Sequence, residues 1–405
     1  MRIYWWILIT LLASLVGVGL ILFMTATPVQ MSLYLILTMV GLFCLIWIIS
    51  RFKGMHLIFS ILLGLVFFGL GYYGMTSYVL SREDTRELPP ITRQVDTPGD
   101  GHTAVVYFTH GEPETYDPIG WLNQFREFDK QGVPFVPKLV RPFFIYQLRN
   151  AYLQVGQSHH RQMHIQMAKA LQQSLIDAGY PDFRVYLSFL DDEPRPDAAV
   201  VDALNKGADE IIAAEIFVSI SNHTAEGEEL IKSVGTEDYG IPLKFTGPLW
   251  NSSTLHRMFV EKANAAIGEM DKSKVGVILV GHGQPDAWDQ EFASETEHEM
   301  LFRQKILDLF VEDGYLADNL GLAWMSFKEP RPAELVEQLI ENNVEMVLFF
   351  SAAISADSIH SQFDIPELIH EADIPDNIPV INLGAWNDHP LTIQAIQELV
   401  LTQVD

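Results

Sequence analysis

The stretch VGVILVGHGQP (residues 275–285) is the plainest structural signal in this chain. Its apolar, β-branched run ends abruptly at Gly281-His282-Gly283, which is typical of a buried parallel strand that stops at the carboxyl edge of an α/β sheet. Ligands bind at that edge in open α/β sheets, because loops from several strands gather there. A single histidine at a strand end more often has a structural role, so His282 gains weight only if other residues support it.

The chain repeats this construction. TAVVYF (103–108) leads into THGEPE (109–114), just as the run above leads into GHGQPD (281–286). Later in each half, SFLDDEPRP begins at Ser188 and SFKEPRP at Ser326, and each is followed by an amphipathic helical pattern and a buried strand. Both matches recur in the same order, so the sequence indicates a duplication of two α/β halves.

Strand and helix patterns alternate in both halves, which predicts parallel sheets with helices on both faces. The expected strands are 103–108, 184–189, 210–218, 275–280, 321–326 and 345–351, and the expected helices lie near 160–178, 197–206, 291–312, 333–342 and 365–371. Strand-end loops of the two lobes could face one another across a cleft. Residues 115–150, rich in aromatic residues and Pro, look like an insertion that could line or cover it.

Residues 1–80 contain three basic residues, no acidic residue and three apolar runs. Each run (4–24, 31–50 and 55–80) meets the roughly 20-residue length needed to cross a bilayer. One cleavable signal peptide does not explain three successive runs. The predicted organisation is a three-helix transmembrane anchor (1–80), a linker (81–103), an N-terminal lobe (104–265) and a C-terminal lobe with a metal site (266–405).

Basic residues flanking the three runs favour one orientation. The side that holds the N-terminus has three of them, and the 25–30 loop on the opposite side has none. This places the remaining chain outside, so we predict an integral membrane protein with an extracytoplasmic globular part. Three Arg residues follow the third run, and they nearly balance the number of basic residues on the side that holds the N-terminus.

Charge and cysteine content exclude several classes of function. Of the chain's 26 basic residues, 23 lie beyond the anchor, against 52 acidic ones, which argues against nucleic acid or anionic lipid as the ligand of the globular part. The one cysteine, Cys44, lies in the second apolar run, so the globular part has no disulfide, cysteine-ligated Fe–S cluster or thiol nucleophile. Phosphate-loop, dinucleotide-binding, HExxH and GxSxG motifs are missing from the sequence.

Histidines follow the apolar strands of both halves. His282 and His360 do so in the second half, and His110 and His223 take the equivalent places in the first. Two imidazoles at neighbouring strand tips suit a divalent transition metal, and neutral imidazole also accepts a proton near physiological pH. The alternative is that these histidines cap strand ends and bind backbone groups.

Further ionisable residues fit a solvated surface about as well as a site. A helical run begins with His159, His160 and His164. Glu295 and Glu299 lie four residues apart on one helical face, and we interpret them as a surface stripe.

At these residues the chain resembles the class II tetrapyrrole chelatases, which include the sirohydrochlorin cobalt- and ferrochelatases and protoporphyrin ferrochelatase. The resemblance covers about 104–400. VGHGQPD (280–286) looks like the family's strand that carries its metal-binding, proton-accepting histidine, here His282. IHSQFDIPELIHEA (359–372) looks like the sirohydrochlorin-chelatase segment with a histidine before a helix start, here His360.

Two further segments extend the resemblance. GAWNDHPL (384–391) resembles the family's closing loop near the tetrapyrrole, which implies that Asn387 and His389 bind there. THGEPE (109–114) is similar to the opening of ferrochelatase, and we expect His110 at the tetrapyrrole as well.

The resemblance implies a mechanism. A tetrapyrrole enters the cleft and is bent, and His282 and His360 strip a divalent metal substrate, Fe²⁺ or Co²⁺, of its waters and pass it to the ring. The same histidines, or Asp364 and Glu329, accept the two pyrrole protons. No nucleotide or Fe–S cluster is expected. Aromatic side chains of the insertion could stack on the ring, although core packing explains them as well: Trp121, Phe143 and Phe144.

Protoporphyrin ferrochelatases usually have Glu where this chain has His360, which favours the sirohydrochlorin type. Three N-terminal transmembrane helices are typical of neither group. The prediction is therefore a membrane-anchored chelatase that inserts Fe²⁺ or Co²⁺ into a tetrapyrrole. The alternatives are a protoporphyrin ferrochelatase, a non-enzymatic membrane-tethered haem- or metal-binding protein, and a divalent-metal sensor. The sequence leaves the oligomeric state open.

Overall fold

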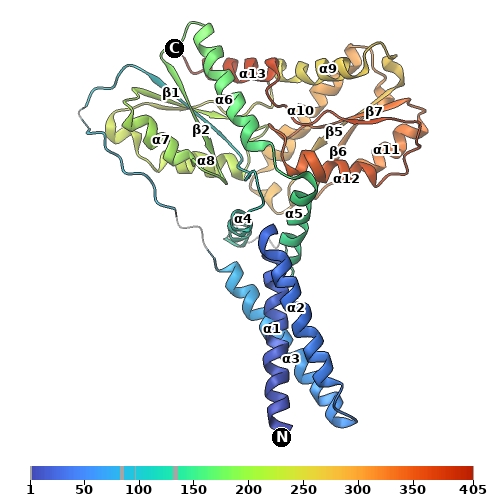
Figure 1. The fold of residues 1–405 in the computed structure, drawn as a ribbon. Coiled ribbons are helices and arrows are strands. Elements are labelled where there is room, and N and C mark those ends of the chain that lie inside the picture. Colours follow the sequence, from blue (N-terminus) through green and yellow to red (C-terminus); the bar gives the residue numbers. More distant parts are fainter. Residues whose placement is uncertain (1, 83–85, 96, 131–135, 405) are drawn as a thin grey trace. The chain divides into compact units, whose positions relative to one another are not determined.

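A computed structural model describes residues 2–82, 86–95, 97–130 and 136–404, and the chain forms two compact units. The first, here called the apolar-helix unit, comprises residues 1–86 and 115–157. The second, the two-lobe unit, comprises residues 87–114 and 158–405. Figure 1 shows the ribbon of both, and each is described separately below.

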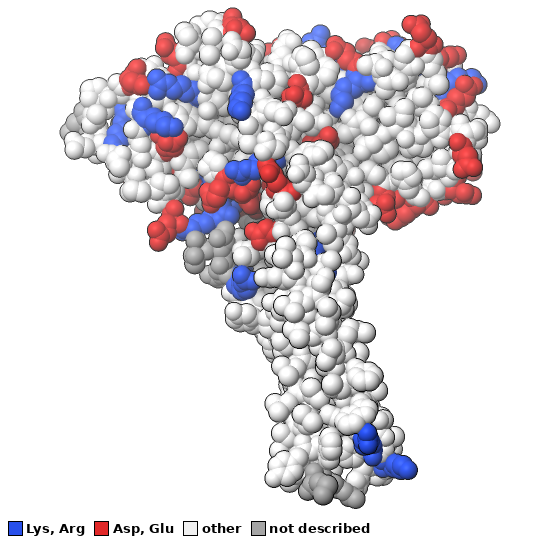
Figure 2. Space-filling view, in the orientation of Figure 1, with Lys and Arg blue, Asp and Glu red and all other residues white. Residues whose placement is uncertain are grey.

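Three long apolar helices dominate the apolar-helix unit: α1 (Arg2–Thr25), α2 (Pro28–Ile49) and α3 (Met55–Leu80). Each is long and apolar enough to cross a membrane. Glycines let α1 and α3 approach closely, since a Cβ at Gly17 would lie 2.4 Å from the Phe68 carbonyl oxygen and one at Gly71 2.2 Å from that of Ser14. In Figure 2 these helices show almost no charged side chains along their length, whereas the lobes show many.

The insertion belongs to this same unit. It forms α4 (Pro118–Lys130) and α5 (Arg141–Val155), which belong to the same compact unit as α1–α3 and not to the two-lobe unit. Phe144 packs against Trp121 with ring centroids 5.9 Å apart, so these two aromatics pack on each other within the insertion.

The two-lobe unit contains two parallel sheets of identical topology. The N-terminal lobe has the strand order β2-β1-β3-β4 and the C-terminal lobe the order β6-β5-β7-β8. The strands are β1 (Thr103–Thr109), β2 (Phe183–Phe189), β3 (Glu210–Glu215), β4 (Leu243–Phe245), β5 (Val275–Gly281), β6 (Leu320–Trp324), β7 (Met346–Ser351) and β8 (Val380–Asn382). The predicted duplication and fold class are therefore confirmed.

Helices cover both faces of each sheet, as parallel strands require. They are α6 (His160–Asp177), α7 (Pro196–Asn205), α8 (Asn222–Lys232), α9 (Ser253–Ile267), α10 (Ala293–Glu312), α11 (Pro332–Glu341), α12 (Ile365–His370) and α13 (Pro390–Leu401), with a π-helical turn η5 (His360–Asp364) before α12 and 3₁₀ turns η1 (Thr236–Tyr239), η2 (Lys272–Lys274), η3 (Trp288–Gln290) and η4 (Ala317–Asn319). The short strands β4 and β8 and the helices α8, α9 and α13 were not anticipated from the sequence.

Alternate residues of the central strands enter different cores. Val105 and Tyr107 of β1 and Leu279 of β5 belong to one cluster that also includes α9, α10 and α13, so a single core joins the lobes. Phe108 and Val280 face outward into two separate clusters, one under α7 and α8 and the other under α11 and α12. The shared core fixes the two sets of strand tips relative to one another.

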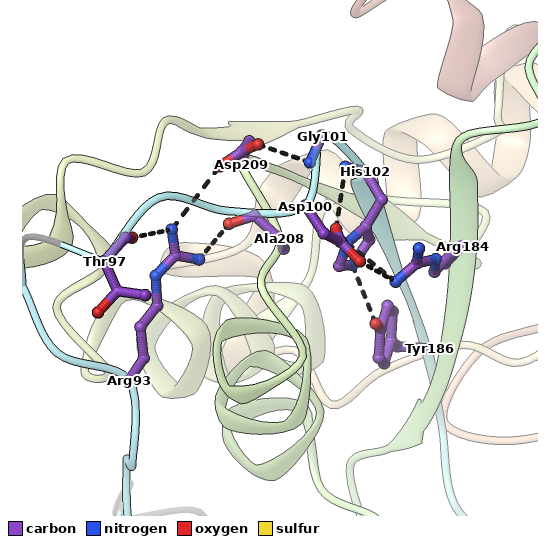
Figure 3. A network of polar contacts seen from close by, with 9 residues as sticks. All are labelled: Arg93, Thr97, Asp100, Gly101, His102, Arg184, Tyr186, Ala208 and Asp209. Carbon is purple, nitrogen blue, oxygen red and sulfur yellow. Dashed lines mark hydrogen bonds and ion pairs between the residues drawn. The ribbon is translucent and has the colours of Figure 1, made fainter.

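The predicted linker 81–103 is only partly a linker, because residues from Glu87 onward belong to the two-lobe unit. Figure 3 shows how this segment is fastened. Arg93 donates to the Ala208 carbonyl oxygen and is paired with Asp209, which accepts from the Gly101 amide at 2.8 Å. His102 bonds the Tyr186 hydroxyl at 3.0 Å. These contacts lie where β1 and β3 begin, at the edge of the sheet opposite the strand tips.

Candidate metal and tetrapyrrole site

His282 and His360 come together at the strand tips of the C-terminal lobe. His282 follows β5 and His360 opens η5 after the neighbouring strand β7, and their ring centroids are 5.7 Å apart. The Nδ1 of His282 donates to the Gly283 carbonyl oxygen at 2.8 Å, and the Nδ1 of His360 pairs with Oδ2 of Asp364 at 2.6 Å. Each ring is thus oriented through Nδ1, which leaves the Nε2 lone pair of the neutral imidazole for a ligand.

The pKa values of the two imidazoles are shifted in opposite directions. Burial, together with the charge of His360, lowers the pKa of His282 to about 4. Burial also acts to lower the pKa of His360, but the hydrogen bond and charge of Asp364 and the charge of Glu112 outweigh it, so that pKa is raised. One histidine therefore stays neutral at physiological pH, while its partner accepts a proton readily.

Two buried charged side chains of α10, Glu299 and Arg303, support the His282 loop. The Glu299 carboxylate accepts from the His282 backbone N–H at 3.0 Å. Arg303 lies beside it, fully buried, and donates to the Ala323 carbonyl oxygen at 2.6 Å. Glu295, one turn earlier, is also buried, and desolvation followed by the charge of Glu299 raises its pKa to about 8. The interpretation of 295–299 as a surface stripe was wrong, because this face of α10 packs on the strand tip.

The N-terminal lobe has the same arrangement of histidines. His110 follows β1 and His223 lies in the first turn of α8 after β3, with ring centroids 4.2 Å apart. The Nδ1 of His110 pairs with Oδ2 of Asp191 at 3.3 Å. Burial, and then the charge of His110, lowers the pKa of His223 well below its ordinary value. Both predicted pairs therefore form at equivalent places.

Glu112 reaches from the N-terminal lobe to the C-terminal lobe. Its Oε1 accepts from the Ile359 backbone N–H at 2.9 Å, directly before His360. Thr109 and Ser355 add a second link, with their hydroxyl oxygens 3.3 Å apart. Burial raises the pKa of Glu112, although a hydrogen bond from Ser158 opposes this. Glu112 was not predicted as a site residue, although it lies within the repeated motif.

Two further histidines lie beneath the strand tips. His160 is 3% and His164 0% exposed, so a solvated face does not describe them. The Nδ1 of His164 pairs with the Tyr107 hydroxyl at 2.7 Å and its Nε2 with the Ser355 hydroxyl at 3.2 Å. His159, the third histidine of this predicted helical run, is exposed.

For three other predicted site residues, the contacts that the structure describes are with residues outside the histidine pairs. Glu329 is exposed on the loop after β6. Asn387 is bound on both its amide atoms by Asp357, each at 2.9 Å. His389 caps α13 by accepting from the Leu391 N–H at 3.3 Å, and burial lowers its pKa. Asn387 and His389 thus have local structural bonds.

Within the described residues, no group of three or more His, Cys, Asp or Glu side chains is arranged to hold a metal ion. A two-histidine pair supplies too few ligands for a closed structural site, which in zinc proteins takes four. It suits an ion whose remaining ligands are exchangeable water or substrate atoms.

Three known structures are among those similar to this chain. SirB from Bacillus subtilis with Fe³⁺ is 13% identical, with 74% of this chain and 94% of that chain covered and a TM-score of 0.47. DR2241 from Deinococcus radiodurans, a multi-domain protein with structural similarity to chelatases, is 13% identical over 74% of this chain and 55% of its own, with a TM-score of 0.46. CbiX, the terminal enzyme for sirohaem biosynthesis in denitrifying bacteria, is 13% identical over 75% of this chain and 100% of its own, with a TM-score of 0.44.

No curated protein matches this chain significantly. The family model for ferrochelatase matches residues 102–404, which is nearly all of the two-lobe unit.

Proposed function

Because the chain belongs to the ferrochelatase family, we propose that its C-terminal lobe inserts Fe(II) or Co(II) into a tetrapyrrole of the sirohydrochlorin type. The single observation that carries the proposal is the His282–His360 pair, with centroids 5.7 Å apart and both rings oriented through Nδ1. A neutral imidazole fixed in this way is a good ligand for these ions.

The metal ion is bound as a substrate and is not retained. The Nε2 atoms of His282 and His360 replace two of its waters, and the pyrrole nitrogens then displace the histidines. Because only two protein atoms hold the ion, its transfer to the ring breaks few bonds. The low pKa of His282 keeps this ligand unprotonated and ready for the next ion.

Insertion of a divalent ion releases two pyrrole protons, so total charge is conserved. His360 accepts these in turn once the metal has left it, and its raised pKa makes it the better base of the pair. Asp364, bonded to the other side of the ring, stabilises the imidazolium until the proton passes to solvent. Glu329, which is exposed on the loop after β6, stays the second candidate acceptor.

The substrate type follows from position 360. Protoporphyrin ferrochelatases usually have Glu there, so a histidine at this position favours sirohydrochlorin. Protoporphyrin is the second candidate, supported by the three apolar helices, since a membrane-anchored enzyme is well placed to collect an apolar ring. We further propose that residues 1–80 anchor the chain in a membrane with the N-terminus inside and the lobes outside, as the basic residues favour.

The test uses the full chain in lipid nanodiscs. It is mixed under anaerobic conditions with sirohydrochlorin or protoporphyrin, each with Fe(II) or Co(II), and metallation is followed by absorbance. We expect many turnovers with sirohydrochlorin, none with His282→Ala and undiminished turnover with His370→Ala, an exposed histidine of the same lobe. Unchanged turnover by His282→Ala would contradict the proposed site. A stoichiometric shift with haem and no turnover would indicate a binding protein instead.

A further inference from the structure

The loop before α5 is held beside the apolar span of α3. The Tyr72 hydroxyl donates to the Leu139 carbonyl oxygen at 2.5 Å. Tyr72 precedes the end of α3 at Leu80 by eight residues, which at a rise of 1.5 Å per residue corresponds to about 12 Å along the helix. The loop therefore does not sit on top of the apolar helices but lies along their last turns.

The other end of α5 returns to the end of α1. The guanidinium of Arg149, 1% exposed, donates to the carbonyl oxygens of Ala26 at 3.1 Å and Phe23 at 2.5 Å. These carbonyls lie at the end of α1, where they have no helical partner, and a cation is favourable there. Arg141 and Arg149 are eight residues apart on α5, again about 12 Å. Two independent tethers thus give α5 the same path along α1 and α3.

The side chains exposed at the start of α5 and in the loop before it are apolar. Leu139, Val140 and Phe143 are 48%, 47% and 49% exposed, similar to Leu70 of α3 at 57%. One turn further along α5, the exposed residue is Gln147. The surface thus changes from apolar to polar in the direction that leaves the apolar span.

The charges next to this apolar tip are paired or can reach polar surroundings. Asp129 pairs with Arg141 at 2.9 Å and with Lys138 at 3.3 Å. Lys138 is 70% exposed, and its long side chain can extend along an apolar layer while its ammonium stays among polar groups. An apolar tip with a basic rim is typical of segments that insert shallowly into one leaflet.

We propose that residues 136–143 are a further membrane contact, in which Leu139, Val140 and Phe143 enter the acyl layer of the outer leaflet while Lys138 faces lipid phosphates. The proposal rests on the membrane anchoring proposed above. It assigns the insertion to the lipid surface, continuous with the lipid-facing side of α3, and not to the covering of a ligand site.

The test places a fluorescent label at Phe143→Cys in a full-length chain that also carries Cys44→Ser, which removes the native cysteine. The matched control is Gln147→Cys, one helical turn or about 6 Å along the same face. In vesicles that contain nitroxide-labelled lipid, we expect several-fold stronger quenching at position 143 than at 147, and the reverse order with aqueous iodide.

Equal quenching at the two positions, or strong iodide quenching at 143, would overturn the proposal. If the Phe143→Cys chain does not fold, Val140→Cys gives the same readout. Flotation of the chain with vesicles is measured in parallel. A chain that does not float refutes the membrane anchor itself, whereas one that floats with position 143 in water refutes only this further contact.

Discussion

The two lobes share a scaffold, and the difference lies in what stands behind their histidines. Both sheets have the same strand order, and both histidine pairs follow the same two strands. In the C-terminal lobe, α10 places two buried charged side chains, Glu299 and Arg303, under the strand tip. In the N-terminal lobe, α6 places the buried imidazoles of His160 and His164 there.

This difference shows how a duplicated fold divides its work. Strand order and strand-tip position follow from the repeated apolar runs, which the lobes have kept. The protonation of the histidines depends on the helix behind each strand tip and on contacts between the lobes. These features differ between the two lobes. In the C-terminal lobe, carboxylates raise the pKa of His360, whereas His223 at the equivalent place has its pKa lowered by burial and by His110. His360 is therefore better suited to accept a proton than His223.

The strongest test of this division replaces equivalent histidines. His282→Ala removes a proposed metal ligand, and we expect it to reduce the metallation rate by more than about 100-fold, since loss of a ligand costs more than loss of the group that orients one. His110→Ala should reduce it by less than about tenfold. The measurement is the initial rate of metallation by folded full-length protein. Equal losses would show that the lobes contribute equally.

The next comparison concerns stability. Arg303→Met removes two hydrogen bonds to the Leu279 and Ala323 carbonyl oxygens and the positive charge near the buried Glu299, so we expect the free energy of unfolding to fall by about 3–5 kcal/mol. His164→Phe keeps the ring and loses two neutral hydrogen bonds, for which we expect about 1–3 kcal/mol. Thermal unfolding of both variants in detergent measures this. The ionic support of the C-terminal lobe would be disproved by the opposite ranking.

The pH dependence distinguishes the pairs further. Only neutral imidazole binds metal, so Co(II) affinity falls as the pH drops through the pKa of His360. Burial acts to lower this pKa, but Asp364 outweighs burial, so the pKa is raised. Asp364→Asn removes that carboxylate, so the loss of affinity should begin at a lower pH. Well above this range, the loss of the orienting bond should weaken binding by about tenfold. Titration of the Co(II) absorption bands with pH is the measurement, and an unmoved acid limb would exclude the carboxylate as the cause.

Much of the C-terminal site followed from the sequence. Continuous apolar runs predicted the central strands, and the carboxyl ends of neighbouring parallel strands must lie close together, so His282 and His360 could be paired without coordinates. The two short edge strands β4 and β8 were not predicted, because a strand of three residues is too short to show a periodic pattern.

The buried charges could not be predicted for a different reason. Glu295, Glu299 and Arg303 are spaced at four residues, and this spacing is the same for a helix face in water and for one packed on a strand tip. Which face of α10 is buried depends on the neighbouring sheet, and sequence spacing does not encode it.

The mildest expected effect concerns one position of the repeated motif. Glu112 and Gln284 occupy the same place in the two copies, but Glu112 binds across the lobes to the Ile359 N–H, while Gln284 binds Asp289 in its own lobe at 2.7 Å. Glu112→Gln keeps an acceptor oxygen for that N–H and removes only the charge near His360. We expect a loss of a few-fold in metallation rate.

Glu112→Ala is the matched variant, because it removes the acceptor as well and leaves a buried N–H unpaired, at a cost of about 1–3 kcal/mol. We expect it to lower the rate by about tenfold and to broaden the Co(II) absorption bands, since His360 is then less firmly positioned. If both variants lost the same activity, the charge alone would matter and the cross-lobe bond would not position His360. If neither lost any, the C-terminal lobe would hold its histidine without help from its duplicate.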